Sequence, residues 1–124
     1  MNTDSELLGV RCYGIDLAED GALVVAERSA GKTGAATRFP AGEEGVSAVR
    51  ERIVRDAARP RICIRSCNAA ALAIALGFAP LPRAEVTLVA PHVIESSARS
   101  GRDPSPTGPE ERAQRLARLA ERLT

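Results

Sequence analysis

Apolar and polar positions follow two different periods along the chain. Short apolar runs bounded by Gly, Pro, Asp or Asn predict strands at residues 10–16, 22–28, 37–39, 61–65 and 85–90. Apolar residues at helical spacing predict helices at residues 42–58, 69–77 and 92–99, followed by a last helix that begins near residue 110. The alternation of the two periods favours an α/β fold.

Turn residues and composition refine several of these elements. Glu19, Asp20 and Gly21 favour a tight turn, so the first two strands are expected to form a hairpin. Residues 29–36 show no periodicity and indicate a turn. Residues 85–90 are almost all apolar, which is typical of a parallel strand covered on both faces.

The order of elements predicts a mixed sheet that opens with an antiparallel hairpin and carries helices on its faces. A chain of 124 residues fits one domain. Within it we expect a core at residues 1–99, a linker rich in Pro and Gly at residues 100–109, and a C-terminal amphipathic helix at residues 110–124.

The last helix has the clearest sequence signals. Thr107 and Glu110 match a capping box, which predicts the start of this helix. In an earlier helix, Gly77 is expected to mark the C-terminal end. An apolar stripe follows at Ala113, Leu116, Ala117, Ala120 and Leu123. This stripe can dock on the sheet or on a partner subunit, and through it we predict a homodimer.

Composition excludes several classes of protein. There are 17 basic and 16 acidic residues, and this near-neutral balance argues against a dedicated, strongly basic nucleic-acid binder. Aromatic residues make up 2% of the chain, too few for a platform that stacks several bases. The chain has no apolar run long enough to span a membrane and no visible secretory signal, and its odd number of cysteines indicates reduced thiols, so we expect a cytoplasmic protein.

Two patterns with chemical potential are better explained by structure. Ala26–Thr33 (AERSAGKT) matches a relaxed phosphate-loop pattern, but no helix is predicted after it, so we expect an exposed turn. Cys63 and Cys67 straddle a strand end, and only Cys12 and His92 could complete a metal site. We therefore expect Cys12 and Cys63 to be small core residues, although a Cys67–His92 catalytic pair stays open.

Several short segments resemble a known family in their order and spacing. They are Gly14-Ile15-Asp16 with its hairpin, Phe39-Pro40 before Glu44-Gly45-Val46, the strand at 62–65, and Val89-Ala90-Pro91-His92-Val93. Together they resemble the N-terminal RuvC-like domain of the DEDD transposases, which include the Piv-type DNA invertases. The resemblance implies an RNase H-like fold over about residues 12–120.

In that family four carboxylates bind two divalent cations for strand cleavage. The carboxylates neutralise the two metals, which coordinate the attacking and the leaving oxygens of the reaction. Asp16 matches the first acid. The second acid, a Glu, corresponds to Arg65, and the last two correspond to Pro109 and Arg112. The permanent charge of an arginine repels a dication, so we expect Arg65 to form an ion pair with Asp16.

These substitutions favour a degenerate, catalytically inactive domain that acts as a binding or remnant module and needs no cofactor. The alternative is a nuclease or recombinase domain that binds Mg²⁺ or Mn²⁺ through Asp16 with Glu110 or Glu111. A third possibility, a sugar-kinase or actin-like domain, needs a second lobe. Weak nucleic-acid contact would use a basic cluster, which is otherwise a solvated helix face: Arg50, Arg52, Arg55, Arg59 and Arg61.

Overall fold

The strands and helices form close to the positions that the apolar periods predict. A computed structural model describes residues 10–66, 68–94 and 108–123. In chain order the elements are β1 (Val10–Leu17), β2 (Leu23–Ser29), β3 (Lys32–Thr33), β4 (Thr37–Phe39), α2 (Glu43–Asp56), β5 (Arg59–Arg65), α3 (Ala69–Phe78), β6 (Glu85–Val89) and α5 (Pro109–Arg122). Residues 91–94 add a helical turn.

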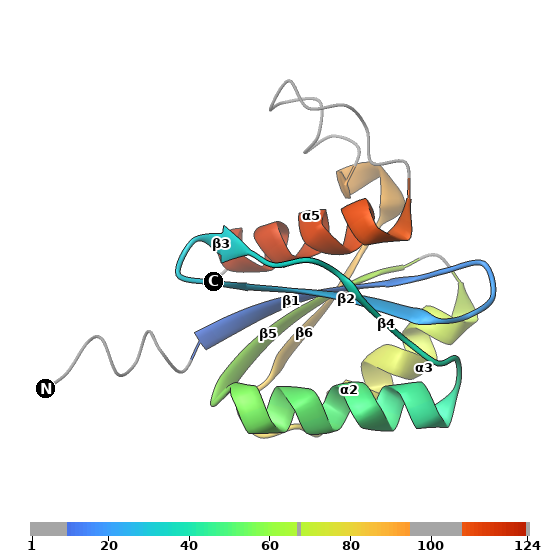
Figure 1. The fold of residues 1–124 in the computed structure, drawn as a ribbon, viewed down its shortest axis with the longest axis horizontal. Coiled ribbons are helices and arrows are strands. Elements are labelled where there is room, and N and C mark those ends of the chain that lie inside the picture. Colours follow the sequence, from blue (N-terminus) through green and yellow to red (C-terminus); the bar gives the residue numbers. More distant parts are fainter. Residues whose placement is uncertain (1–9, 67, 95–107, 124) are drawn as a thin grey trace, which may run out of the picture.

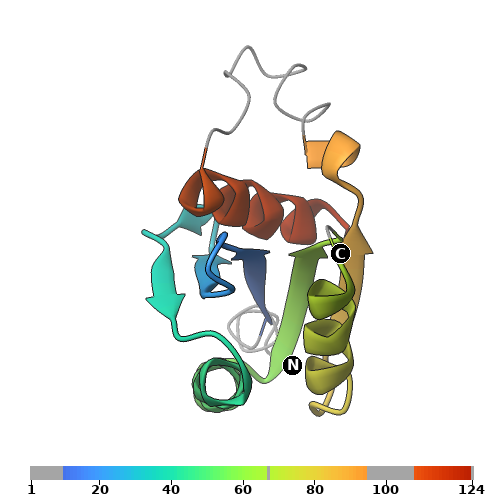
Figure 2. The same ribbon diagram turned by 90° about the vertical axis from the view of Figure 1, so that its right-hand side faces the viewer.

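The strands form one open, mixed sheet with the order β3-β2-β1-β5-β6, and β4 also pairs with β2. β1 and β2 are antiparallel, whereas β5 is parallel to β1 on one side and to β6 on the other. Figure 1 shows α5 on one face of this sheet and α2 and α3 on the opposite face, and Figure 2 shows the same layers from the end. The protein therefore has an α/β fold, as the alternating periods predict.

The central strand β1 divides its side chains between the two faces, because successive residues of a strand point in opposite directions. Tyr13 and Ile15 pack in a cluster with residues of α2 and α3. Cys12 packs in a cluster with residues of α5, and a side chain at Gly14 would meet α5 as well. Asp16 belongs to the same alternating set as Cys12 and Gly14, so it lies on the α5 face.

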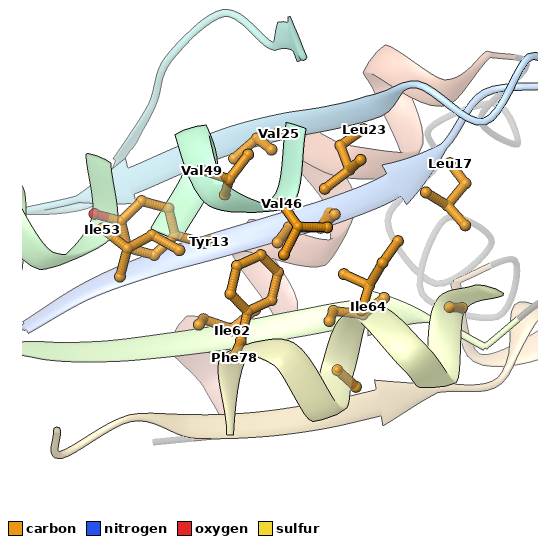
Figure 3. Close-up of a cluster of buried hydrophobic side chains, with 14 residues drawn as sticks. Tyr13, Leu17, Leu23, Val25, Val46, Val49, Ile53, Ile62, Ile64 and Phe78 are labelled. Carbon is orange, nitrogen blue, oxygen red and sulfur yellow. The ribbon is translucent and has the colours of Figure 1, made fainter. Parts of the chain in front are cut away.

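The face under α2 and α3 holds the larger apolar core (Figure 3). Tyr13 of β1, Ile53 of α2 and Phe78 of α3 are each at most 1% exposed. Burial of a side chain of this size contributes about 1.5–3 kcal/mol relative to exposure. The few aromatic residues of the chain therefore contribute strongly to this core.

Small residues allow α5 to approach the other face closely. Ala113 and Ala117 are fully buried and pack in a cluster with Val24 and Ala26 of β2. A Cβ atom at Gly14 would lie 1.9 Å from the carbonyl oxygen of Ala113 and 2.4 Å from the backbone nitrogen of Ala117. The alanine-rich stripe of the last helix thus packs on the sheet of its own chain.

Two extended segments differ from the sequence prediction. Residues 85–90 were expected to be covered on both faces, but β6 is an edge strand in which only Val89 is buried. Val86 packs against the cluster under α2 and α3, and Val89 packs in the cluster under α5. Residues 29–36 contain the short strand β3 in addition to the expected turn.

The helix boundaries also differ. Gly77 lies inside α3, which continues to a C-cap at Ala79, because a helical Gly costs only about 1 kcal/mol and does not by itself end a helix. The N-cap of α5 is Gly108, with no side-chain cap, so the predicted capping box is wrong. Thr107 and the rest of the predicted linker up to residue 107 lie outside the described residues, as do residues 95–99 of the predicted third helix.

Helix length also bears on the expected absence of a membrane span. α2 and α5 have 14 residues each. Within residues 10–66, 68–94 and 108–123, no helix combines the length and apolarity needed to cross a bilayer.

Candidate functional site

The carboxylate of Asp16 is enclosed between two arginines near the carboxyl end of β1. Arg65 Nε donates a hydrogen bond to Asp16 Oδ1 at 2.5 Å, and Arg112 Nε donates one to Asp16 Oδ2 at 2.7 Å. Asp16 is the only fully buried charged side chain in the described part of the chain. Each oxygen of this buried carboxylate thus has a charged donor, which is the condition under which the protein interior tolerates an ion.

The sheet register and the docking of α5 bring these three charges together. Ile15 of β1 lies opposite Ile64 of the parallel strand β5, so Asp16 and Arg65 follow at the same edge of the sheet. Arg112 lies at the start of α5, which packs directly over Gly14. The Arg65–Asp16 ion pair expected from the sequence is confirmed, and Arg112 is an additional partner that was not expected.

An open hollow of about 820 Å³ adjoins this charged cluster. Its lining contains three basic side chains, an N-cap residue, the residues of the β1–β2 turn, and the first residue of α5: Arg38, Arg65, Arg112, Asn68, Leu17, Ala18, Glu19, Asp20 and Pro109. In Figure 1 these segments meet at the right-hand end of the molecule, where the β1–β2 turn and the first turns of α3 and α5 lie. The hollow is therefore at the end of the sheet to which Asp16 belongs.

Glu110 takes part in an ion pair at the rim of the hollow. Arg38 donates to Glu110 Oε2 from Nε at 3.1 Å, and a terminal nitrogen of Arg38 lies 3.0 Å from the same oxygen. A backbone hydrogen bond at Glu110 itself, followed by the Arg38 guanidinium, lowers the pKa of this carboxyl group. Both side chains are half exposed, so this pair contributes little to stability.

The metal-binding alternative requires Glu110 or Glu111 beside Asp16. Glu111 is exposed on the first turn of α5, and Glu110 faces Arg38. Among the residues that the structure describes, no three carboxylate, imidazole or thiol groups gather closely enough to hold a metal ion. The residues beside Asp16 instead offer guanidinium groups, which cannot bind a cation.

The arginines considered for nucleic-acid contact are distributed over two elements. Arg50, Arg52 and Arg55 belong to α2, and Arg59 and Arg61 belong to β5. Arg52 lies 3.5 Å from Glu27 of β2, whereas Arg61 forms an ion pair with Glu85 of β6. These acidic partners reduce the charge available for phosphate, and nucleic-acid contact through this cluster stays a prediction.

The phosphate-loop-like segment forms the end of one strand, a turn and the next strand. Ala30 and Gly31 form the turn with φ values of 53° and 77°, and Lys32 and Thr33 then pair with β2 as strand β3. The following element is β4, so this loop does not lead into a helix whose N-terminus could hold phosphate. The expected exposed turn is confirmed.

The described cysteines are core residues. Cys12 and Cys63 are buried free thiols in the cluster under α5. Burial raises the pKa of Cys63 to about 12 and also raises the pKa of Cys12. Thiols that stay protonated at neutral pH are poor nucleophiles and poor metal ligands. His92 is exposed on the helical turn after β6, and Cys67 lies outside the described residues.

Sequence patterns did not identify all the residues of the hollow. Arg38 is the middle residue of the short strand β4, and Asn68 precedes α3 as its N-cap, accepting a hydrogen bond from the backbone nitrogen of Ala71. An N-cap Asn before an apolar helix is a recognisable local signal. The approach of Arg112 to Asp16 has no such local signal, because 96 residues separate the two along the chain, and only the resemblance, which aligns Arg112 with a metal-binding acid, indicated it.

Comparison with known proteins adds no family assignment. A scan against models of known protein families gives no match, and a search of the curated proteins finds no similar chain.

Proposed function

We propose that this chain is a non-catalytic binding domain of the RNase H-like class, derived from a DEDD-transposase-like domain whose metal site has been replaced by arginines. The observation that carries this proposal is the contact of both Asp16 oxygens with guanidinium groups. The two arginines involved, Arg65 and Arg112, stand where the family resemblance implies metal-binding acids. The carboxylate that would bind a metal is thus held by protein cations.

Electrostatics explains why this arrangement disfavours a metal. In the family the site gathers negative charges that attract dications, whereas here two positive charges surround a single negative one. A dication at Asp16 would have to displace at least one guanidinium and then lie beside the other. The buried arginines therefore neutralise Asp16, as the resemblance implies that metal ions do in the family.

The fold is compatible with this proposal at a coarser level. The central strand β1 is followed by an antiparallel partner, is paired in parallel with β5 on its other side, and carries its acid near its carboxyl end. The resemblance places the first metal-binding acid of an RNase H-like domain at this location. Helices cover both faces of the sheet, as the class requires.

Restoration of the acids provides the sharpest test. We expect the Arg65→Glu/Arg112→Asp variant, which keeps Asp16, to be stabilised by Mn²⁺ in thermal unfolding and to bind Mn²⁺ in calorimetric titration. The wild-type protein should show neither effect. The control Arg55→Glu/Arg59→Asp makes the same change of charge at exposed positions and should not bind Mn²⁺.

The nuclease alternative makes the opposite prediction. If the wild-type chain binds Mg²⁺ or Mn²⁺ through Asp16 with Glu110 or Glu111, titration will show binding that Asp16→Asn removes. That result would overturn the proposed function. Circular dichroism of the acid-restored variant checks that it is folded before its metal titration is interpreted, and the wild-type titration decides between the two functions by itself.

Self-association through α5 also stays a prediction. The apolar stripe of α5 is mostly covered by the sheet of its own chain, with Leu116 fully buried, but Leu123 is 56% exposed at its end. We expect a dimer to contact this end of the helix. Analytical ultracentrifugation of the wild type and of Leu123→Glu tests it, and a wild-type sample that sediments only as a monomer at high concentration would exclude the dimer.

A further inference from the structure

A second hollow of about 370 Å³ lies between α2 and α3 and adjoins the arginine-lined hollow. The two share part of their lining, namely Leu17, Ala18, Glu19 and Asn68. Both volumes fall in the range of small-molecule sites, about 300–1,000 Å³. The end of the molecule thus offers one extended concavity with two compartments.

The compartment between α2 and α3 is apolar. Leu17, Val46 and Ile74, each at most 9% exposed, contribute apolar side chains to its lining, and most of the remaining lining residues are Ala or Gly. Two of the alanines, Ala70 and Ala73, are exposed on α3. Small side chains on both helices leave space that a narrow hydrocarbon chain can fill, and filling it removes apolar surface from water.

The lining of the other compartment includes the acids Glu19 and Asp20, but the cluster around Asp16 has an excess of hydrogen-bond donors and of positive charge. Arg65 and Arg112 together donate to one carboxylate, and each guanidinium has more N–H groups than that shared carboxylate can accept. The three side chains carry one net positive charge, while the neighbouring pair of Arg38 with Glu110 is neutral. Asp16 thus fixes two arginine forks that can still bind a planar or tetrahedral oxyanion.

Two groups near the junction of the compartments act on an anion in opposite directions. Asn68 caps α3, whose first turn contains no acidic residue, so the positive end of this helix is not offset by its own side chains. Glu19 lines both compartments and is exposed. Its charge offsets the attraction of this helix end, so the guanidinium groups of Arg65 and Arg112 are the more favourable place for the anionic group.

We propose that the two compartments form one site for a small amphipathic anion, with a carboxylate or phosphate group at Arg65 and Arg112 and an unbranched apolar chain between α2 and α3. This inference rests on the proposed function, because a metal ion at Asp16 would remove the arginines from the site. It adds the class of ligand that the binding domain accepts.

Calorimetric titration of the full chain with matched probes tests the site. Nonanoate and octyl phosphate carry the same octyl chain on two different anions, acetate and inorganic phosphate lack the chain, and octanol lacks the charge. We expect at least one octyl anion to bind about tenfold or more tightly than its short-chain counterpart, since each buried methylene adds affinity. The stronger octyl anion identifies the head group as carboxylate or phosphate.

Variants assign the two compartments. Ala73→Phe, which fills the apolar compartment from an exposed helix position, should weaken the octyl anion about tenfold, whereas Leu76→Phe on the same helix lies outside the lining and should not. Arg112→Lys keeps a cation near Asp16 but loses the fork, and should weaken the octyl anion about tenfold. Arg55→Lys is its exposed control, and Glu19→Gln should strengthen binding severalfold.

The outcomes separate the two proposals. Absence of octyl-anion binding in a protein that also fails to bind Mn²⁺ overturns the ligand site and leaves the proposed function in place. Mn²⁺ binding that depends on Asp16 overturns the proposed function itself. Equal binding of the octyl anion to the wild type and to Ala73→Phe, or weaker binding to Glu19→Gln, contradicts the assigned orientation and with it the site.

Discussion

Beneath α2 and α3 the sheet presents Tyr13, Ile15 and Leu17 of β1, whereas beneath α5 the same strand presents Cys12, Gly14 and Asp16. Large apolar side chains hold two helices on the first face. Small residues let one helix approach the backbone on the second face. Because α5 comes so close, the side chain of Arg112 can reach Asp16. The candidate site therefore depends on the α5 face, which has the smaller apolar side chains.

The largest loss of stability is expected when one methyl group is added where β1 contacts α5. Gly14→Ala places its Cβ against the backbone of Ala113 and Ala117, which cannot move without displacing the helix. We expect a loss of about 4 kcal/mol in the free energy of unfolding, measured by urea denaturation. Gly34→Ala is the matched control, because its Cβ would meet nothing closer than 3.8 Å. Equal stability of the two variants would mean that α5 does not pack as described.

On the same face, removal of one charged partner of Asp16 should also lower the free energy of unfolding. Arg112→Gln leaves Asp16, which is fully buried, with one charged partner, and should cost about 2 kcal/mol of unfolding free energy. Arg122→Gln removes an exposed arginine from the last turn of the same helix and should cost less than about 0.5 kcal/mol. Urea denaturation of both variants at neutral pH measures the difference, and equal losses would contradict the role of Arg112.

The thiols of the α5 face predict a loss of stability in alkali. Above pH 9 the unfolded chain loses the Cys63 proton, while the folded chain keeps it up to about pH 12, so the unfolded state binds fewer protons and the unfolding free energy falls. The slope due to Cys63 is at most about 1.4 kcal/mol per pH unit.

Cys63→Ala should therefore flatten the dependence of stability on pH between pH 9 and 11, even though it is less stable at neutral pH. The neighbouring Cys12 and, on the other face, Tyr13 also have raised pKa values because they are buried, so some of the slope should remain. Urea denaturation at a series of pH values gives both slopes. Parallel curves for the variant and the wild type would show that Cys63 is accessible to solvent.

The smallest change in stability is expected from removal of one hydroxyl group on the face under α2 and α3. The Tyr13 hydroxyl is buried and has no hydrogen-bond partner among the described residues, so Tyr13→Phe removes an unsatisfied polar group. We expect a gain of about 0.5–1 kcal/mol, seen as a higher Tm. Phe78→Tyr introduces a hydroxyl into the same core and should lower the Tm. A lower Tm for Tyr13→Phe would indicate a bound water at this hydroxyl.

Local patterns in the sequence were sufficient for most elements and for part of the site. The hairpin, the amphipathic helix α2 and the strand β5 follow from residue periodicity and turn chemistry, which depend on neighbours in the chain. The pairing of Arg65 with Asp16 was expected from the family resemblance, which aligns Arg65 with a second metal-binding acid. The boundaries of α3 and α5 were less predictable, since helix ends depend on packing as well as on local residues.

The alternation in VRCYGID by itself determined that one face of β1 is large and apolar and the other small and polar. Only the tertiary structure decided what covers each face, and that β6 is a mostly exposed edge strand although three of its five residues are apolar. It also decided that Arg112, 96 residues from Asp16, completes the buried ion cluster. The physical reason is that side-chain period is a property of each segment, whereas the close approach of α5 depends on Gly14 and the alanines fitting each other in space.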